Sequence, residues 1–321
     1  MNGKLTLAIT ESNNFNPAVV EKLKDFFSVR LFDIKSEADL LLALENADIA
    51  FIRLRFHFRS DILKQLPKLK YIVTATTGLD HIDTNYFNSI GGVVVSLRGE
   101  TAFLSSIPST AEFTWGLLLS IYKNTIKAST DVNAGNWQRD QFRGRNLKNK
   151  RIGILGLGRV GKQVANYART FSMEVGFYDP VEVSTDFLKM PTAEELFSWA
   201  DIISIHIDYS SRNHNFVDAS LLRYCKETAV LINTSRGAVW DEEYLAELIR
   251  NKKVFGVATD VIVDEFIEKS VHQNPLVKLA NEGYNVIVTP HIAGATIESM
   301  AETEFFVMKK LLKILNYECA E

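Results

Sequence analysis

The stretch Arg151–Gly161, Arg-Ile-Gly-Ile-Leu-Gly-Leu-Gly-Arg-Val-Gly, decides the fold of this chain. Its apolar first half predicts a strand, and a helical pattern leaves the glycines. The spacing Gly-x-Gly-x-x-Gly suits a dinucleotide. The first glycine permits a tight turn, the second lets a pyrophosphate approach the backbone, and the third lets helix and strand pack closely. The phosphates would face the helix N-terminus. The nucleotide-binding residues expected here are Gly156, Gly158, Arg159, Val160 and Gly161.

An acidic residue follows the next predicted strand, as such a site requires. The strand Glu174–Tyr178 ends in Asp179, which lies 18 residues past Gly161 (179 − 161). A carboxylate at this place meets the adenosine ribose diol, and it would repel the 2'-phosphate of NADP. The alternative is a glycine turn in a nucleotide-free sheet, but the complete order of strand, loop, helix, strand and Asp disfavours it. The sequence therefore predicts an NAD site.

Strands and helices alternate throughout the chain, in two separate series. One series runs from Leu5 to Ser96, and the other runs from Arg151 to Val288. Alternation of this kind predicts parallel sheets with helices on both faces. We therefore expect an α/β protein with two doubly wound parallel-sheet domains. The long apolar helical pattern from Ser109 to Lys127 lies between the two series, and a second long helix is expected from Thr296 to Asn316.

The composition excludes several classes of protein. The 321 residues are 46% hydrophobic and carry a net charge of −3, so neither nucleic acid nor an anionic membrane is expected as a partner. Cys225 and Cys319 are too few for a disulfide scaffold. No apolar run reaches the roughly 20 residues that span a bilayer, and the N-terminus lacks the features of a signal peptide. We expect a cytoplasmic protein, and we expect no metal site.

Arg236, Glu265 and His291 each stand just past a predicted parallel strand, where the ligand crevice of such a sheet lies. Hydride transfer to a 2-keto acid requires that the carboxylate is held, the carbonyl is polarised and a proton is moved. Arginine can bind the carboxylate and lean on the carbonyl oxygen. Histidine can move the proton, and a bonded carboxylate fixes its tautomer. Each residue alone has a simpler interpretation as a surface or loop residue, but together they indicate catalysis.

These motifs resemble those of the D-isomer-specific 2-hydroxy acid dehydrogenases, and the resemblance covers nearly the whole chain. The arginine motif is Asn233–Gly237, the acidic motif is Asp260 with Glu265, and the histidine motif is Pro290–Gly294. The stretch Thr76–Asp83 resembles the family's substrate-domain loop, whose backbone amides hold the substrate carboxylate.

The resemblance implies roles for further residues. Arg236, Glu265 and His291 would be catalytic, and Arg236 would also bind substrate together with Thr77 and Gly78. Additional NAD-binding residues would be His206, Thr234, Asp260 and Gly294. The resemblance also implies a flavodoxin-like substrate domain over residues 1–98 and 295–321, completed by the C-terminal helix, and a Rossmann NAD-binding domain over residues 99–294.

Three departures from the family pattern stand out. Asp208 replaces the proline that usually follows two residues after His206, in the adenosine pocket. Phe266 follows Glu265, where the family often has proline. The stretch 96–110 is about five residues longer than in common members, and it lacks their Asn-x-Pro.

Basic residues cluster at one strand end of the first domain. Arg53, Arg55, His57 and Arg59 alternate with apolar residues, and the resemblance places this loop over the cleft. Alternation sends about half of such side chains inward, so Arg55 is the one expected to meet a second anionic group of the substrate, such as a phosphate. The alternative is a solvated basic strand end.

The apolar helix at 109–127 predicts a homodimer, since one nucleotide domain does not need so many apolar faces, and the resembling family pairs through this region. A rival to the enzyme is an NAD-sensing scaffold, because the C-terminal-binding-protein corepressors resemble the same family and keep the same three residues. An unrelated oxidoreductase chemistry on the same fold is a third interpretation.

Overall fold

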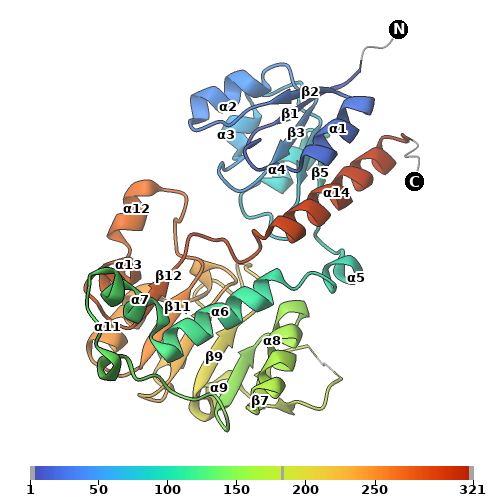
Figure 1. Ribbon diagram of the computed structural model, residues 1–321. Coiled ribbons are helices and arrows are strands. Elements are labelled where there is room, and N and C mark those ends of the chain that lie inside the picture. Colours follow the sequence, from blue (N-terminus) through green and yellow to red (C-terminus); the bar gives the residue numbers. More distant parts are fainter. Residues whose placement is uncertain (1–3, 182–183, 318–321) are drawn as a thin grey trace. The chain divides into compact units, whose positions relative to one another are not determined.

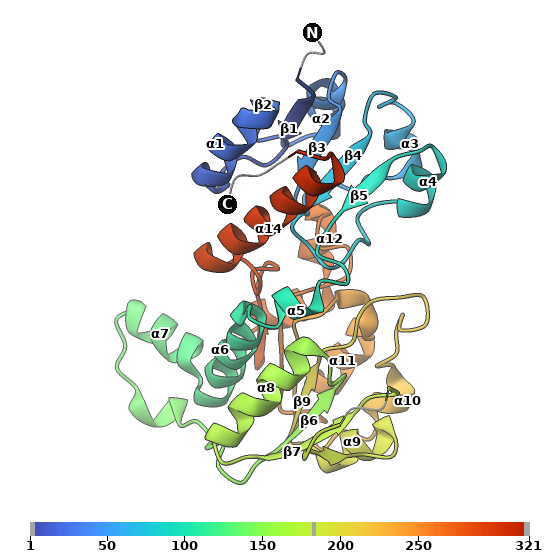
Figure 2. The ribbon, with the colours of Figure 1, turned by 90° about the vertical axis from the view of Figure 1, so that its right-hand side faces the viewer.

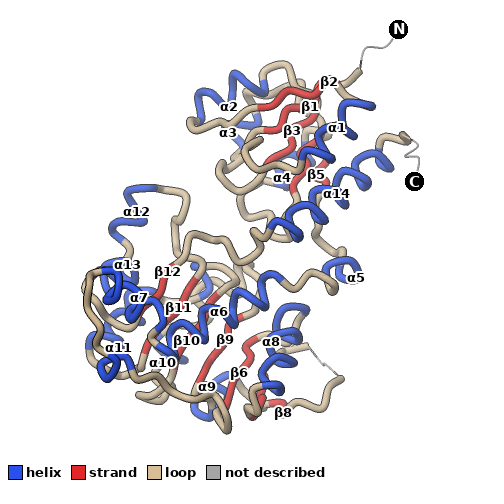
Figure 3. Tube along the Cα trace, in the orientation of Figure 1, coloured by secondary structure: helices blue, strands red, loops and turns tan. Residues whose placement is uncertain are grey.

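The computed structural model describes residues 4–181 and 184–317, and the chain divides into two compact units. Unit 1 comprises Met1–Ser106 and Thr296–Glu321, and unit 2 comprises Ile107–Ala295. Each unit has one parallel sheet with helices on both faces (Figure 1; Figure 3). The predicted α/β class with two doubly wound parallel sheets is therefore confirmed.

Unit 1 has a flavodoxin-like sheet with the strand order β2-β1-β3-β4-β5. β3 is buried along its whole length, because helices cover both faces of the sheet. The strands are β1 Thr6–Ile9, β2 Ser28–Leu31, β3 Ile49–Ile52, β4 Tyr71–Thr74 and β5 Val93–Val95.

Two helices far apart in sequence share one face of this sheet. The first, α1 (Pro17–Phe26), begins with proline, whose missing amide hydrogen is not needed in the first turn. The second, α14 (Ile297–Ile314), buries Val307, Met308 and Leu311 and contacts α1, β4 and β5. A core cluster beside the strands joins the other helices, which are α2 Glu37–Leu44, α3 Ser60–Leu63 and α4 Thr84–Ser89.

The boundary between the units differs from the sequence-based one. It falls at Ser106 and Ile107 instead of residues 98 and 99, because an additional helix, α5 (Thr101–Leu104), belongs to unit 1. Phe103 stacks on Phe306 with ring centroids 4.0 Å apart. Lys310 Nζ donates to the carbonyl oxygen of Ser96 at 3.0 Å and to Glu100 Oε1 at 2.5 Å. These contacts fasten the longer loop to α14.

Unit 2 has the strand order β12-β11-β10-β9-β6-β7-β8, and the order in which the strands are added to the sheet reverses between β6 and β9. Ligands bind at such a reversal, beyond the carboxyl ends of the strands. The strands are β6 Arg151–Leu155, β7 Glu174–Tyr178, β8 Leu188–Lys189, β9 Ile202–Ile205, β10 Val230–Asn233, β11 Gly256–Thr259 and β12 Val286–Val288.

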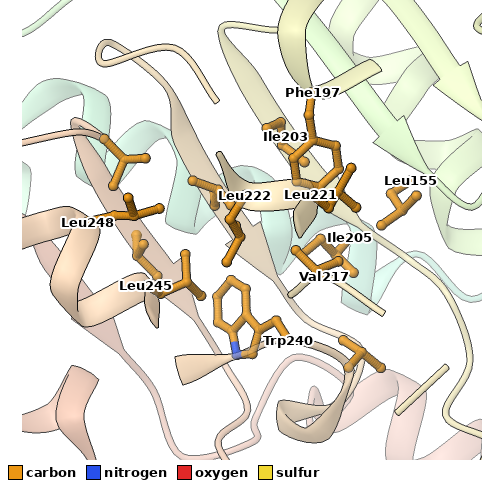
Figure 4. Close-up of a cluster of buried hydrophobic side chains, with 14 of the residues drawn as sticks. Leu155, Phe197, Ile203, Ile205, Val217, Leu221, Leu222, Trp240, Leu245 and Leu248 are labelled. Atoms are coloured by element: carbon orange, nitrogen blue, oxygen red, sulfur yellow. The ribbon is translucent and has the colours of Figure 1, made fainter. Parts of the chain in front are cut away.

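Helices cover both faces of this sheet (Figure 2). One face packs on α6 (Ser109–Lys123) and α8 (Arg159–Thr170). The other packs on a larger apolar cluster, whose centre includes the fully buried Trp240 beside Leu222 and Leu245 (Figure 4). The helices on that side are α9 Ala193–Trp199, α10 Ala219–Leu222, α11 Glu242–Arg250 and α13 Pro275–Asn281. The short elements η1 Arg139–Phe142, η2 Gly237–Val239 and α12 Glu268–Gln273 complete the unit.

The long helix expected from 109 to 127 is two helices. Asn124 takes the left-handed conformation with φ 55°, so α6 ends there and α7 (Thr125–Asn133) begins. Asparagine tolerates this conformation better than most residues do. The apolar side of α6 is largely buried inside unit 2, whereas α7 has no buried residue. Within 4–181 and 184–317, no helix is long and apolar enough to cross a membrane.

Candidate active site

The three candidate catalytic residues lie beyond neighbouring strands of unit 2. Because β10, β11 and β12 are parallel and adjacent, their carboxyl ends meet at one edge of the sheet. Backbone hydrogen bonds continue past the strands. The amide of Asp260 donates to the carbonyl oxygen of Asn233 at 2.9 Å, and the amide of His291 donates to that of Asp260 at 2.8 Å. The loops that carry the functional residues are thus tied to one another.

The structure brings Glu265 and His291 into direct contact. His291 Nδ1 and Glu265 Oε1 are 2.5 Å apart, and both side chains are less than a fifth exposed. The other carboxylate oxygen, Oε2, is buried and makes no hydrogen bond to the described residues. The carboxylate therefore acts on the imidazole, where it fixes the tautomer and leaves Nε2 to face a reactant.

The backbone at this pair is held in an unusual conformation. His291 and Asp264, the residue before Glu265, both have φ 54°. Non-glycine residues seldom adopt this region, and such strain persists only where surrounding contacts enforce it. The two loops therefore present Glu265 and His291 to each other at a conformational cost.

Asp260 supplies one of those enforcing contacts. Its carboxylate is fully buried and accepts hydrogen bonds from Thr289 Oγ1 at 2.6 Å, from the Ile292 amide at 3.0 Å and from the Ala293 amide at 2.7 Å. Burial raises the pKa of Asp260, and these donors oppose the rise. Asp260 was expected to contact the cofactor. The structure places both carboxylate oxygens on the loop that carries His291, and the contact with the cofactor stays a prediction.

A neutral side chain braces the loop that carries Arg236. Asn233 Nδ2 donates to the Arg236 carbonyl oxygen at 2.9 Å, and Asn233 Oδ1 accepts from the Ser235 amide at 2.9 Å. The next residue must be glycine, because a Cβ on Gly237 would lie 2.1 Å from the carbonyl carbon of Ile262. The Arg236 loop thus packs directly on the loop that leads to Glu265. The sequence motif contains Asn233 but predicted no role for it, although an asparagine before Thr-Ser-Arg indicates an Asx turn.

The glycine loop has the shape that a pyrophosphate needs. Gly156 has φ 90°, and a Cβ there would lie 2.9 Å from the His206 carbonyl oxygen. A Cβ on Gly161 would lie 2.2 Å from the Gly156 carbonyl oxygen, so this glycine permits the close helix–strand contact. A Cβ on Gly158 would meet nothing within 4 Å, which leaves its backbone open to a ligand. The helix α8 begins at the next residue without a side-chain cap, as suits phosphate binding.

Asp179 lies beside this loop, as expected. Its Oδ2 accepts from the Leu157 amide and its Oδ1 accepts from the Val181 amide, both at 2.8 Å. Both donors are neutral backbone amides, and a carboxylate at this place can accept from the ribose hydroxyls of a dinucleotide. The Asp179 carboxylate and the open backbone at Gly158 fit NAD.

The other expected cofactor residues are spread over several strand ends. His206 follows β9, its Nε2 lies 2.7 Å from Ser204 Oγ, and burial lowers its pKa to about 3, so the ring is neutral at ordinary pH. Thr234 follows β10 and shares a 2.9 Å hydrogen bond with Thr114. Arg159 Nη1 donates to the Ile107 carbonyl oxygen at 3.4 Å. Val160 is half-buried and Gly294 is exposed.

The basic cluster in unit 1 is neutralised by carboxylates. Arg53 bonds Glu304 at 2.7 Å, and Arg55 Nη1 bonds Asp33 at 3.0 Å and the Ile34 carbonyl oxygen at 2.5 Å. Arg59 bonds both Glu37 and Asp61. The cluster therefore offers a ligand less positive charge than the sequence suggests. Thr77 and Gly78 follow β4 in the same unit, where Thr76 Oγ1 donates to the Gly78 carbonyl oxygen at 2.9 Å.

Comparison with known proteins gives a consistent result. Residues 115–293 match the family model described as "D-isomer specific 2-hydroxyacid dehydrogenase, NAD binding domain". A D-3-phosphoglycerate dehydrogenase of Methanocaldococcus jannaschii is 31% identical over 291 residues, which cover 89% of this chain and 53% of that protein. The chain thus spans about half the length of this relative. A hydroxypyruvate reductase of Thermotoga maritima is 28% identical over 87% of this chain and 88% of its own length.

A solved structure agrees with these matches. The structure of D-lactate dehydrogenase from Aquifex aeolicus, complexed with NAD and lactic acid, superposes with a TM-score of 0.81 at 27% identity, covering 97% of this chain and 95% of that chain. The named relatives are dehydrogenases and reductases, so the comparisons do not favour the corepressor-like scaffold.

Proposed function

The chain belongs to the D-isomer specific 2-hydroxyacid dehydrogenases, and from this premise we propose that it transfers a hydride between NAD(H) and C2 of a D-2-hydroxy or 2-keto acid. The observation that carries the proposal is the 2.5 Å contact between His291 Nδ1 and Glu265 Oε1, beside the braced Arg236 loop. Glu265, His291 and Arg236 follow adjacent strands of the unit that bears the dinucleotide loop.

Each residue has a separate task in the proposed reduction. Arg236 binds the substrate carboxylate and polarises the carbonyl, because its guanidinium is a planar fork with a permanent charge. His291 donates the proton from Nε2 to the carbonyl oxygen while its Nδ1 stays bonded to Glu265. Glu265 stabilises the imidazolium that precedes this transfer. Bound NADH supplies the hydride to C2, and the reverse sequence oxidises the hydroxy acid.

The proposed substrate contacts in unit 1 are the backbone amides of Thr77 and Gly78, which would help to hold the carboxylate. Arg55 would meet a second anionic or strongly polar group. Its side chain is 42% exposed, and Asp33 and the Ile34 carbonyl oxygen are both bound by Nη1. Support for Arg53 and Arg59 is weaker, since Arg53 is largely buried against Glu304 and Arg59 has two carboxylate partners.

The test of the activity is the oxidation of NADH in the presence of a panel of 2-keto acids. The panel includes pyruvate, glyoxylate, hydroxypyruvate and a phosphorylated 2-keto acid. We expect consumption of NADH with at least one of them, and the rate should vanish without the keto acid. An enzyme that binds NADH but reduces none of these compounds would support a scaffold and would falsify the proposal.

We also propose a homodimer, on different grounds from those that the sequence suggested. Within residues 109–137, the exposed large apolar residues lie in and after α7, not in α6. They include Ile126 at 48%, Val132 at 46% and Trp137 at 86% exposure. We take these residues as the candidate dimer surface. Light scattering should give about twice the 36.2 kDa chain mass.

A matched pair of variants tests the location of the dimer contact. Trp137→Ser should weaken the dimer. Leu42→Ser should not, because Leu42 is similarly exposed, at 71%, but lies on α2 of unit 1. A monomeric wild-type protein at micromolar concentration would contradict the proposal.

A cytoplasmic location is proposed as well, since Cys225 is a free, half-buried thiol.

A further inference from the structure

The segment that carries Glu265 lacks a core of its own. This arch, residues 263–274, leaves β11 and ends where α13 begins. Among its described side chains, only Asn274 is buried, and the rest are half-buried or exposed. Apolar burial therefore does little to hold the arch in place, although Glu265 must meet His291 within hydrogen-bond distance.

Both ends of the arch bind one buried carboxylate. Glu242, the first residue of α11, is only 7% exposed. Its Oε1 accepts from the Val263 amide at 3.0 Å, and its Oε2 accepts from Asn274 Nδ2 at 2.5 Å. Val263 lies two residues before Glu265 (265 − 263). The carboxylate thus joins the two ends of the arch, and we call this pair of hydrogen bonds the clasp.

The direction of each hydrogen bond is fixed. A backbone amide can only donate, so Oε1 must accept from Val263. Asn274 cannot turn its amide around, because its Oδ1 accepts from the Leu276 and Val277 amides at the start of α13. Glu242 must therefore offer an acceptor on both oxygens, which a carboxylate does and a carboxamide does not.

Burial of the Glu242 carboxylate costs free energy, and its two hydrogen bonds offset part of that cost. Burial raises the pKa of Glu242 to about 7, while the donors Val263 and Asn274 act against that rise. The Arg236 loop is packed against the same place, since a Cβ on Gly237 would lie 2.4 Å from the Val263 amide nitrogen. A displacement of Val263 would thus disturb both the Glu265 side and the Arg236 side of the site.

We propose that Glu242 is a positioning residue for the proposed reaction, which clasps the two ends of the arch through Val263 and Asn274 and so holds Glu265 against His291. Glu242 does not touch substrate or cofactor in this proposal. It acts through the backbone at Val263. The inference rests on the proposed function for its kinetic consequence, but the clasp itself is a property of the fold.

The test is an exchange of donor and acceptor between the two side chains. Glu242→Gln turns a donor toward Asn274 Nδ2, and Asn274→Asp turns a second carboxylate toward Glu242. Each single change breaks the contact. The double variant Glu242→Gln/Asn274→Asp restores it, because the new carboxamide on α11 can donate to the new carboxylate, and aspartate caps α13 as well as asparagine does. Glu243→Gln is the matched control, since this neighbouring glutamate of α11 is exposed.

We expect each single variant to lower kcat at least about tenfold, because a displacement of about 1 Å in a catalytic group can cost about a hundredfold. The KM for NADH should change little, since the glycine loop lies on other strands. The kcat of the double variant should return to within a few-fold of the wild-type value. The kcat of Glu243→Gln should equal the wild-type value. A double variant no better than the singles, or singles with wild-type kcat, would overturn the proposal.

Amide hydrogen exchange over residues 263–274 separates this proposal from the activity. Exchange should quicken in both single variants and slow again in the double variant, whether or not any 2-keto acid is reduced. If the wild-type protein reduces no keto acid, the proposed function fails, and the exchange result alone decides on the clasp. If Glu242→Gln does not fold, recovery of folded protein by adding Asn274→Asp supports the clasp, and no recovery contradicts it.

Discussion

The strand ends of the two units carry charged side chains in different ways. In unit 2, Glu265 and His291 come from different loops and bond each other, and the loop of Arg236 is braced by the neutral amide of Asn233. In unit 1, Arg53 and Arg55 stand at a similar strand end, but each is bound to a carboxylate of its own unit. In unit 1 the charges at the strand end are thus compensated by carboxylates of the same unit, whereas in unit 2 the ion pair between Glu265 and His291 joins two of the proposed catalytic residues.

The largest expected effect tests the unit 2 side of this comparison. His291→Ala and Arg236→Ala should each lower kcat by several orders of magnitude, because one removes the proton donor and the other removes the carboxylate clamp. The dissociation constant for NADH, measured by fluorescence titration, should stay within a few-fold of wild type. Near-wild-type turnover by either variant would remove that residue from the proposed mechanism.

A second prediction extends the comparison to Asp179. Its carboxylate accepts hydrogen bonds from the neutral Leu157 and Val181 amides, so it should present its full charge to the cofactor. Wild type should prefer NAD, and Asp179→Ala should shift the ratio of kcat/KM for NAD over NADP by about ten- to a hundredfold toward NADP. A wild-type preference for NADP would contradict the assignment.

A third prediction concerns the buried glutamates that support the two regions. Glu242 in unit 2 accepts from the Val263 amide, and Glu11 in unit 1 accepts from the Arg55 amide. Burial raises the pKa of Glu242 from 4.5 to about 7, and it raises that of Glu11 also. Because the folded state binds the proton more tightly than the unfolded state, the free energy of unfolding should fall as pH rises from about 4.5 through about 7.

Denaturant unfolding at a series of pH values measures this effect. Glu242→Gln cannot ionise, so it should flatten the decline by an amount on the order of 3 kcal/mol or less. Glu247→Gln, at an exposed glutamate further along α11 that does not act on the pKa of Glu242, serves as the control and should keep the wild-type slope. Equal slopes in wild type and Glu242→Gln would show that the buried carboxyl does not titrate differently in the folded and unfolded states.

The smallest expected effect tests the unit 1 side. Arg55→Ala should raise the KM for phosphorylated keto acids about tenfold and leave pyruvate or glyoxylate reduction little changed, since one charge-assisted contact contributes about 1.5–3 kcal/mol. Arg59→Ala is the control and should affect neither substrate. Equal losses on charged and uncharged substrates would mean that Arg55 serves Asp33 and Ile34 only, and the comparison between the units would become sharper.

Much of this molecule could be predicted from residues close together in sequence. The parallel sheets and the dinucleotide loop follow from local patterns, because hydrophobic period and glycine spacing report local backbone geometry. The break at Asn124 and the helix α5 were missed, since one left-handed asparagine and four residues of helix leave little periodic signal. Pairings across the sequence were the least predictable. Nothing in the sequence links Arg55 to Asp33.

Glu242 illustrates the same limit next to the candidate active site. In sequence it is an acidic residue in the first turn of a helix, following the capping Asp241, which is an ordinary place for a glutamate. Only the folded chain shows that it is buried and bound to both ends of the Glu265 arch. Asp260 is similar, because its motif suggests a ligand contact while its oxygens serve the His291 loop.

The most direct test of the central claim follows the hydride itself. The protein is supplied with NADH that carries deuterium at the transferable C4 position, together with the 2-keto acid that it reduces fastest. The product is then examined by mass spectrometry and chiral chromatography. The account predicts one deuterium at C2 of a D-2-hydroxy acid. Consumption of the labelled cofactor with no deuterium at C2, or an L-hydroxy acid as the product, would contradict it.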